Sequence, residues 1–141
     1  MIKYILCFIL FFNTLQIASA ETNKVKFKTN TDVVKALKAE PGNPVQGPFE
    51  LKILAISQSG FNTRLHTKKD IKDPENIIIE LAPFMVQYYT KQFNTTIEQF
   101  FLNQVFAVNG KAISVQTSED EQLHTEYVIK VFLANQLTHL Q

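Results

Sequence analysis

The stretch that decides the fold is "RLHTKKDIKDPENIIIEL", residues 64–81, in which a charged segment runs directly into three isoleucines. Seven of its first twelve side chains are charged. Residues 73–76, "DPEN", have the composition of a turn, because proline presets φ and Asp and Asn bond to nearby backbone groups. The β-branched run after them has too few residues for an ordinary helix. We therefore predict a strand over residues 77–81, preceded by a charged hairpin tip.

Further strands are predicted on both sides of this one, from apolar residues that alternate with polar ones or run continuously. Their ranges are 49–58, 61–67, 100–115 and 126–137. Asn109-Gly110 interrupts the fourth range, and this pair predicts either a tight hairpin or a bend in one continuous strand. Residues 117–125, "TSEDEQLHT", are predicted to be a polar loop.

Helices are predicted at only a few places. Pro83 suits a first helical turn, and the apolar spacing after it predicts a helix over 84–93. Thr95 with Glu98 three residues later is a capping box for one more turn. A short peripheral helix is predicted over 33–39, capped by residues 30–32.

The N-terminus has the pattern of an export signal. Lys3 precedes the apolar run 4–12, and Ala18-Ser19-Ala20 offers the small residues that a signal peptidase requires. The apolar run is shorter than the roughly 20 residues that cross a bilayer. We predict a signal peptide over residues 1–20 with cleavage after Ala20, no transmembrane segment in the mature chain, and a periplasmic or extracellular location.

Composition limits what the mature chain contains. Removing 20 of the 141 residues leaves 121, enough for one domain, and the only cysteine leaves with the signal. Residues 21–48 form a basic segment that ends in the Pro- and Gly-rich linker "EPGNPVQGP", so the compact domain is predicted over 49–141. Lysine and arginine balance aspartate and glutamate at 13 each after position 20. This balance argues against a protein that binds along nucleic acid without sequence preference, because such binding depends on net positive charge.

The order of these elements predicts the fold class. Strand, strand, strand, helix, strand, strand is the order of the OB-fold. The expectation is therefore a mainly β protein with one or two short helices, whose five strands close into an OB-fold-like barrel.

The opening stretch also resembles a pattern found in small exported bacterial OB-fold proteins, roughly L-N-[ST]-x-x-D-[YF]-R-[DS]-x-x-N-[FL]-T-[IV]. The matching residues are Leu65, Thr67, Asp70, Asp73, Asn76 and Ile79. The sequence departs from the pattern at His66, Ile71, Lys72, Ile77 and Ile78. The resemblance implies a binding domain without catalytic machinery, and the missing aromatic at Ile71 weakens any transfer of base stacking.

The candidate binding site is the basic hairpin over residues 61–76. In one interpretation its side chains contact phosphates, a lipid headgroup or a carboxylate-bearing partner. In the other they form a solvated hairpin tip, partly neutralised by Asp70 and Asp73. The candidate ligand-binding residues are Phe61, a platform for stacking, and Arg64, His66, Lys68, Lys69 and Lys72.

A second segment is expected to face the same cleft. Glu119, Asp120 and Glu121 follow one another in the loop before the last strand and would repel a phosphate backbone. Nucleic acid is therefore ranked below a protein or anionic partner, because a cleft with a basic and an acidic wall favours a partner of matching polarity.

No motif in the chain supports catalysis or a metal. His66, His124 and His139 lack metal-site spacing, and "SQSG" at 57–60 is not a nucleophile elbow. We therefore expect no enzyme activity, no catalytic residues and no cofactor. The expected function is an exported binding module, which in an intracellular bacterium could act on host components. The alternatives are an oligonucleotide or oligosaccharide binder and a hydrolase with a dispersed site.

Overall fold

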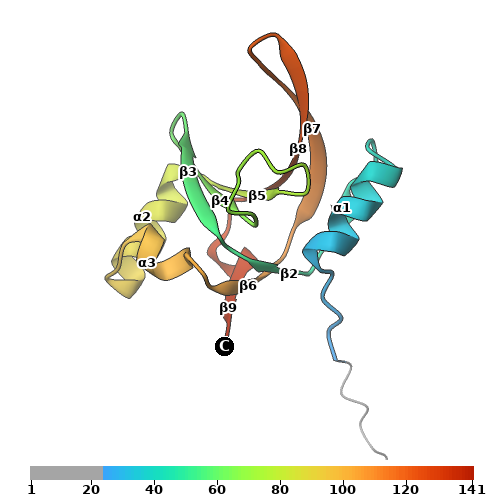
Figure 1. The fold of residues 1–141 in the computed structure, drawn as a ribbon. Coiled ribbons are helices and arrows are strands. Elements are labelled where there is room, and N and C mark those ends of the chain that lie inside the picture. The colour runs from blue at the N-terminus through green and yellow to red at the C-terminus, as the bar shows by residue number, and fades with distance from the viewer. Residues whose placement is uncertain (1–23) are drawn as a thin grey trace, which may run out of the picture.

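The computed structural model describes residues 24–141, so the predicted signal peptide lies outside the described residues. Figure 1 shows three α-helices around a set of twisted strands. The helices are α1 (Asn30–Ala39), α2 (Pro83–Phe93), α3 (Ile97–Phe101) and the 3₁₀ turn η1 (Ala134–Gln136). The strands are β1 (Val45–Gln46), β2 (Phe49–Lys52), β3 (Ala55–Ser59), β4 (Asn62–His66), β5 (Ile77–Leu81), β6 (Val105–Val108), β7 (Lys111–Glu119), β8 (Gln122–Val131) and β9 (Leu137–Leu140).

The predicted closed barrel is wrong. The strands form an open six-stranded mixed sheet in the order β1-β7-β8-β5-β4-β3 and a separate three-stranded antiparallel sheet in the order β2-β6-β9. The only parallel ladder among the named strands of the described chain joins β5 to β8, from Ile77 opposite Tyr127 to Leu81 opposite Val131. The protein is therefore mixed α/β, with three helices where one or two were predicted.

The first predicted strand, 49–58, divides because two consecutive residues bond to different neighbours. The Ile53 amide donates to the Gln104 carbonyl at 2.9 Å, whereas the Leu54 amide donates to the His66 carbonyl at 2.8 Å. The chain thus passes from the small sheet to the large one at this point, and β2 and β3 belong to different sheets.

The predicted strand 100–115 divides in a similar way. Thr96 and Gln99 form a reciprocal capping box, so Phe100 and Phe101 are helical and the strand begins only at Val105. At Asn109-Gly110 the chain bends without a hairpin, because β6 pairs with β2 and β9 while β7 pairs with β8 and β1. Both predicted alternatives, a tight hairpin and a bend in one continuous strand, are therefore wrong, because β6 and β7 are separate strands of different sheets.

The predicted polar loop 117–125 is wrong, because these residues complete a long hairpin. β7 and β8 pair continuously from Ala112 opposite Ile129 to Glu119 opposite Gln122. Asp120 and Glu121 form the two-residue turn, and both have the positive φ (50° and 64°) that a type I′ turn requires. In Figure 1 this hairpin projects beyond the other strands.

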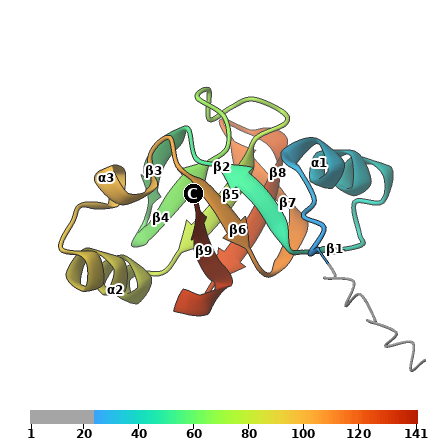
Figure 2. The same cartoon turned by 90° about the horizontal axis from the view of Figure 1, so that it is seen from below.

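The core lies between the sheets and beneath the helices. α1 was predicted to be peripheral, yet Val33, Val34 and Leu37 on one face are at most 2% exposed and belong to the core. Its N-cap is Thr29, which forms a capping box with Asp32. Figures 1 and 2 show α1 on one side of the strands and α2 with α3 on the opposite side. Within residues 24–141, none of the helices is both long and apolar enough to cross a membrane.

Candidate functional site

The segment between β4 and β5, residues 67–76, is a loop organised by the buried side chain of Asn76. Its Oδ1 accepts hydrogen bonds from the amides of Thr67 (3.1 Å) and Lys68 (3.3 Å). Its Nδ2 lies 3.1 Å from the Ile71 carbonyl and 2.9 Å from Nδ1 of His66. The carboxamide of Asn76 therefore joins the two ends of the loop to its middle.

Other residues of the motif also shape this loop. Oδ1 of Asp70 accepts from the Lys72 amide at 3.0 Å, and Oδ1 of Asp73 accepts from the Glu75 amide at 2.7 Å. The Thr67 hydroxyl accepts from the Ile77 amide at 2.9 Å. The two aspartate bonds are local side-chain turns of the kind that Asp favours, whereas the Thr67 bond joins the start of the loop to the first residue of β5. The motif positions therefore set the conformation of the loop, and their side chains are occupied within it.

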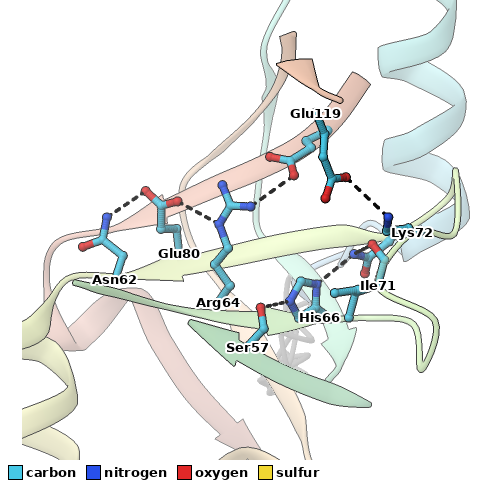
Figure 3. Close-up of polar contacts among 10 residues, drawn as sticks. Ser57, Asn62, Arg64, His66, Ile71, Lys72, Glu80 and Glu119 are labelled. Atoms are coloured by element: carbon cyan, nitrogen blue, oxygen red, sulfur yellow. Dashed lines mark hydrogen bonds and ion pairs between the residues drawn. The ribbon is translucent and has the colours of Figure 1, made fainter. Parts of the chain in front are cut away.

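His66 was predicted to contact a ligand, but it is 2% exposed and lies inside a chain of hydrogen bonds. Because Oδ1 of Asn76 accepts from two amides, its Nδ2 must donate to Nδ1 of His66. The proton of the neutral imidazole is then on Nε2, which donates to Oγ of Ser57 at 2.7 Å. To act as the general base that activates Ser57, His66 would need an unprotonated ring nitrogen facing the serine hydroxyl. This arrangement therefore fits a structural role for the pair better than nucleophilic catalysis (Figure 3).

The environment of His66 predicts a pH-dependent stability. Burial and, secondarily, the positive charge of Arg64 hold the pKa of His66 below its ordinary value of 6.5. The unfolded chain thus takes up a proton at a higher pH than the folded protein, so stability falls as the pH drops through 6.5 towards the folded pKa.

Melting temperatures measured across this range should decrease with falling pH in the wild type and vary less in His66→Gln. The control Phe61→Ser keeps every ionisable group and should retain the wild-type slope. Equal slopes in wild type and His66→Gln would contradict the buried, neutral imidazole.

Arg64, also predicted to contact a ligand, is paired within the protein. Its Nε lies 3.3 Å from Oε2 of Glu80, and its Nη1 lies 3.1 Å from Oε1 of Glu126. Asn62 extends the network by donating to Glu80 at 3.3 Å. Figure 3 shows the side chains of Asn62, Arg64 and Glu80 next to one another on the large sheet. With two carboxylates against it, the guanidinium is poorly placed to bind a further anion.

The three predicted lysines differ in their surroundings. Nζ of Lys68 lies 3.9 Å from Glu75, and Nζ of Lys72 lies 3.5 Å from Glu119 at the end of the projecting hairpin. Lys69 is exposed at the tip of the loop. The structure thus brings the predicted basic and acidic segments together through Lys72 and Glu119, and the charges partly neutralise each other.

Phe61 lies apart from the other predicted residues. It occupies the turn between β3 and β4 next to Gly60 and is 91% exposed. It does not line the groove described next.

A groove of about 450 Å³ lies between the loop 67–76 and the β7–β8 hairpin, and we call it the hairpin groove. Ile78 and Tyr127 are its buried apolar residues, whereas Ile71 and Leu123 are 47% and 77% exposed. Its polar lining comprises Lys38, Lys72, Asp73, Asn76, Thr117, Glu119, His124, Thr125 and Glu126, and Pro74 completes it. The basic segment 61–76 and the acidic segment around residues 119–121 were expected to face one cleft, and residues of both line this groove.

Sequence reasoning missed the apolar part of this groove. Ile71 was treated only as a departure from a motif, and Leu123 was placed in a polar loop. A signal was available, because Leu123, Thr125 and Tyr127 continue the period-two pattern of the last strand towards the turn. Of the six predicted residues, only Lys72 lines the groove.

No protein-family model, curated protein or solved structure matches the chain. Within residues 24–141, no three His, Cys, Asp or Glu side chains are grouped closely enough to hold a metal ion.

Proposed function

We propose that the protein is a non-enzymatic binding module that holds an extended segment of a protein partner in the hairpin groove. The observation that carries the proposal is that two exposed apolar side chains line the same groove, Ile71 from the loop 67–76 and Leu123 from the β7–β8 hairpin. A large apolar side chain inserted between them would be removed from water, which contributes about 1.5–3 kcal/mol for a residue such as Leu or Phe.

The charges around the groove support a protein segment over a polyanion. The basic side chains Lys68 and Lys72 each face a carboxylate, and Glu119 and Glu126 line the same groove. A phosphate backbone would meet these acids, whereas a peptide that carries both charge signs beside an apolar anchor would match them. The signal-peptide pattern supports a site of action outside the cytoplasm, as expected from the sequence.

Selection from a random peptide library tests the proposal. Bound peptides should share a large apolar residue, and Ile71→Lys and Leu123→Lys should each weaken binding by about tenfold or more, the equivalent of one lost apolar contact. Phe61→Lys is the matched control, since it changes an exposed apolar residue outside the groove and should bind normally.

The anionic alternative makes the opposite prediction. If phosphate-bearing ligands bind instead, their affinity should fall steeply with salt and be lost in the double variant Lys68→Glu, Lys69→Glu, with Leu123→Lys unaffected. That result would overturn the proposal of an apolar anchor.

A further inference from the structure

The first half of β8 has an open strand edge. On one side this half pairs continuously with β7. On the other side β8 pairs only with β5, and that parallel ladder begins at Tyr127 opposite Ile77. In the described part of the chain, residues 122–126 therefore have no strand beside them on the side away from β7. Figure 1 shows this part of the hairpin extending beyond β5.

The edge is open because the chain that precedes β5 turns out of the sheet. Pro74 has no backbone amide, and the Asn76 amide donates to the Asp73 carbonyl at 2.9 Å, so residues 73–76 form a turn instead of continuing the strand. Within residues 24–141, no backbone hydrogen bond joins the loop 67–76 to residues 122–126. The loop thus borders the edge of β8 without pairing with it.

The pairing with β7 determines which backbone groups of β8 face this edge. Glu119 and Gln122 flank the two-residue turn and form a hydrogen-bonded pair, so hydrogen-bonded and non-hydrogen-bonded pairs alternate along the ladder from there. The amides and carbonyls of Leu123 and Thr125 therefore point away from β7. They form a short row of donors and acceptors, on the side that β5 occupies further along β8.

The hairpin groove lies along this edge. The consecutive residues Leu123 to Tyr127 all line it. Successive side chains of a strand point to opposite faces of the sheet, so Leu123, Thr125 and Tyr127 lie on one face, and His124 and Glu126 lie on the other. Side chains from both faces border a single groove when that groove follows the edge of the strand. The backbone groups of Leu123 and Thr125 therefore face the groove.

We infer that the partner's segment binds as an added β-strand, hydrogen-bonded to Leu123 and Thr125 in the position that β5 leaves open. The inference rests on the proposed function and adds the class of partner, an extended polypeptide with free backbone amides. Alternating donors and acceptors at strand spacing match another peptide backbone, as in other proteins that bind peptides by strand addition. A side chain opposite Leu123 lies on the same face as Leu123, so one segment supplies both the backbone bonds and the apolar anchor.

The ion pair between Lys72 and Glu119 does not prevent this binding. It joins the loop 67–76 to the end of the hairpin at 3.5 Å, and both side chains are exposed. Exposed ion pairs are weak and are screened by salt. An incoming segment can therefore separate the two side chains, and the charged residues that it carries can replace each partner.

Proline substitution on the two edges of the hairpin tests strand addition. The probe is the tightest peptide from the random library, labelled with fluorescein. Thr125→Pro removes an amide that faces the groove and does not bond to β7, so the hairpin should persist while the dissociation constant of the peptide rises by about tenfold or more. Fluorescence anisotropy measures the affinity, and circular dichroism verifies the fold.

Two control variants match Thr125→Pro closely. Gln116 lies directly opposite Thr125, and its amide faces the other edge of the hairpin, so Gln116→Pro makes the same chemical change away from the groove. Thr125→Ala keeps the groove-facing amide. All three variants lose the 2.9 Å hydrogen bond from Nε2 of Gln116 to Oγ1 of Thr125. Only Thr125→Pro should bind the peptide more weakly than the wild type.

Methylation of the peptide's amides tests the same inference on the wild-type protein. The amides of an added strand face β8 at every second residue and point away from it at the residues between. Methylation of single amides should therefore weaken binding by about tenfold at alternate positions and leave it unchanged at the others. An equal effect at all positions, or no effect at any, would overturn strand addition.

The outcomes separate this inference from the proposed function. Binding that is lost in Leu123→Lys but ignores Thr125→Pro and amide methylation would keep the proposed function and overturn strand addition. Binding that depends on the Thr125 amide but not on Leu123 would support strand addition and overturn the apolar anchor. A library that yields no specific peptide contradicts both. A wild-type dimer in sedimentation equilibrium that Thr125→Pro converts to monomers would place a second copy at this edge and overturn the peptide partner.

Discussion

Replacing Asn76 by alanine is expected to lower the free energy of unfolding by about 3 kcal/mol, a large fraction of the stability of a small domain. The side chain makes four hydrogen bonds, to the amides of Thr67 and Lys68, the Ile71 carbonyl and His66. Truncation leaves Nδ1 of His66 and the Lys68 amide without partners, and each such group costs about 1–3 kcal/mol before relaxation. The Thr67 amide keeps its hydrogen bond to the Ile77 carbonyl (3.1 Å). Urea denaturation measures the loss.

Two variants separate the role of the Asn76 carboxamide from a general effect of mutation. Asn76→Asp keeps the acceptor for the amides of Thr67 and Lys68 but removes the donor to Ile71 and His66. The Lys68 amide should remain protected from hydrogen exchange in Asn76→Asp and exchange faster in Asn76→Ala, whereas the Thr67 amide also donates to the Ile77 carbonyl and should change less. Asn62→Ala removes an asparagine that makes one hydrogen bond, of 3.3 Å, and should cost about 0.5–1 kcal/mol. Equal losses for Asn62→Ala and Asn76→Ala would show that the loop does not depend on Asn76.

Local signals in the sequence predicted the elements well. The strand over 77–81 has the predicted bounds, and the helix predicted over 84–93 begins one residue earlier, at Pro83. Both follow from short-range chemistry, namely β-branched residues after a proline turn and proline at a first helical turn. The helix predicted over 33–39 also forms, although its capping box extends it to Asn30.

The arrangement of the sheets was not predictable in the same way. Whether the chain continues straight at Ile53 or passes to another sheet depends on the backbone of Gln104, which is distant in sequence. The charged cluster presented the same difficulty. Arg64 pairs with Glu126 across 62 positions, so the sequence around residue 64 shows a cation without its partner. Residues of the two predicted segments do line one groove, whereas His66 is buried and Arg64 is paired with carboxylates of the protein itself.

Replacing Arg64 by methionine is expected to cost about 3 kcal/mol, because it leaves two carboxylates without their shared cation. The side chains of Glu80 and Glu126 are only 16% and 25% exposed, and Oε2 of Glu126 is buried without a hydrogen-bond partner in the described part of the chain. Because both carboxylates keep some contact with solvent, the expected loss of stability lies at the lower end of the range for buried ion pairs.

Removing all three charges together should recover most of the stability that Arg64→Met loses. In the triple variant Arg64→Met, Glu80→Leu, Glu126→Leu, no carboxylate is left unpaired at this position, and apolar replacement of a whole ion network is often neutral or stabilising. Arg64→Lys keeps one charge but cannot form two directed contacts, so it should fall between the wild type and Arg64→Met. Thermal and urea denaturation of the four proteins measure this order. The alternative role of Arg64 as a ligand-binding cation predicts unchanged stability in Arg64→Met together with loss of anion binding, and that outcome would contradict the structural role argued here.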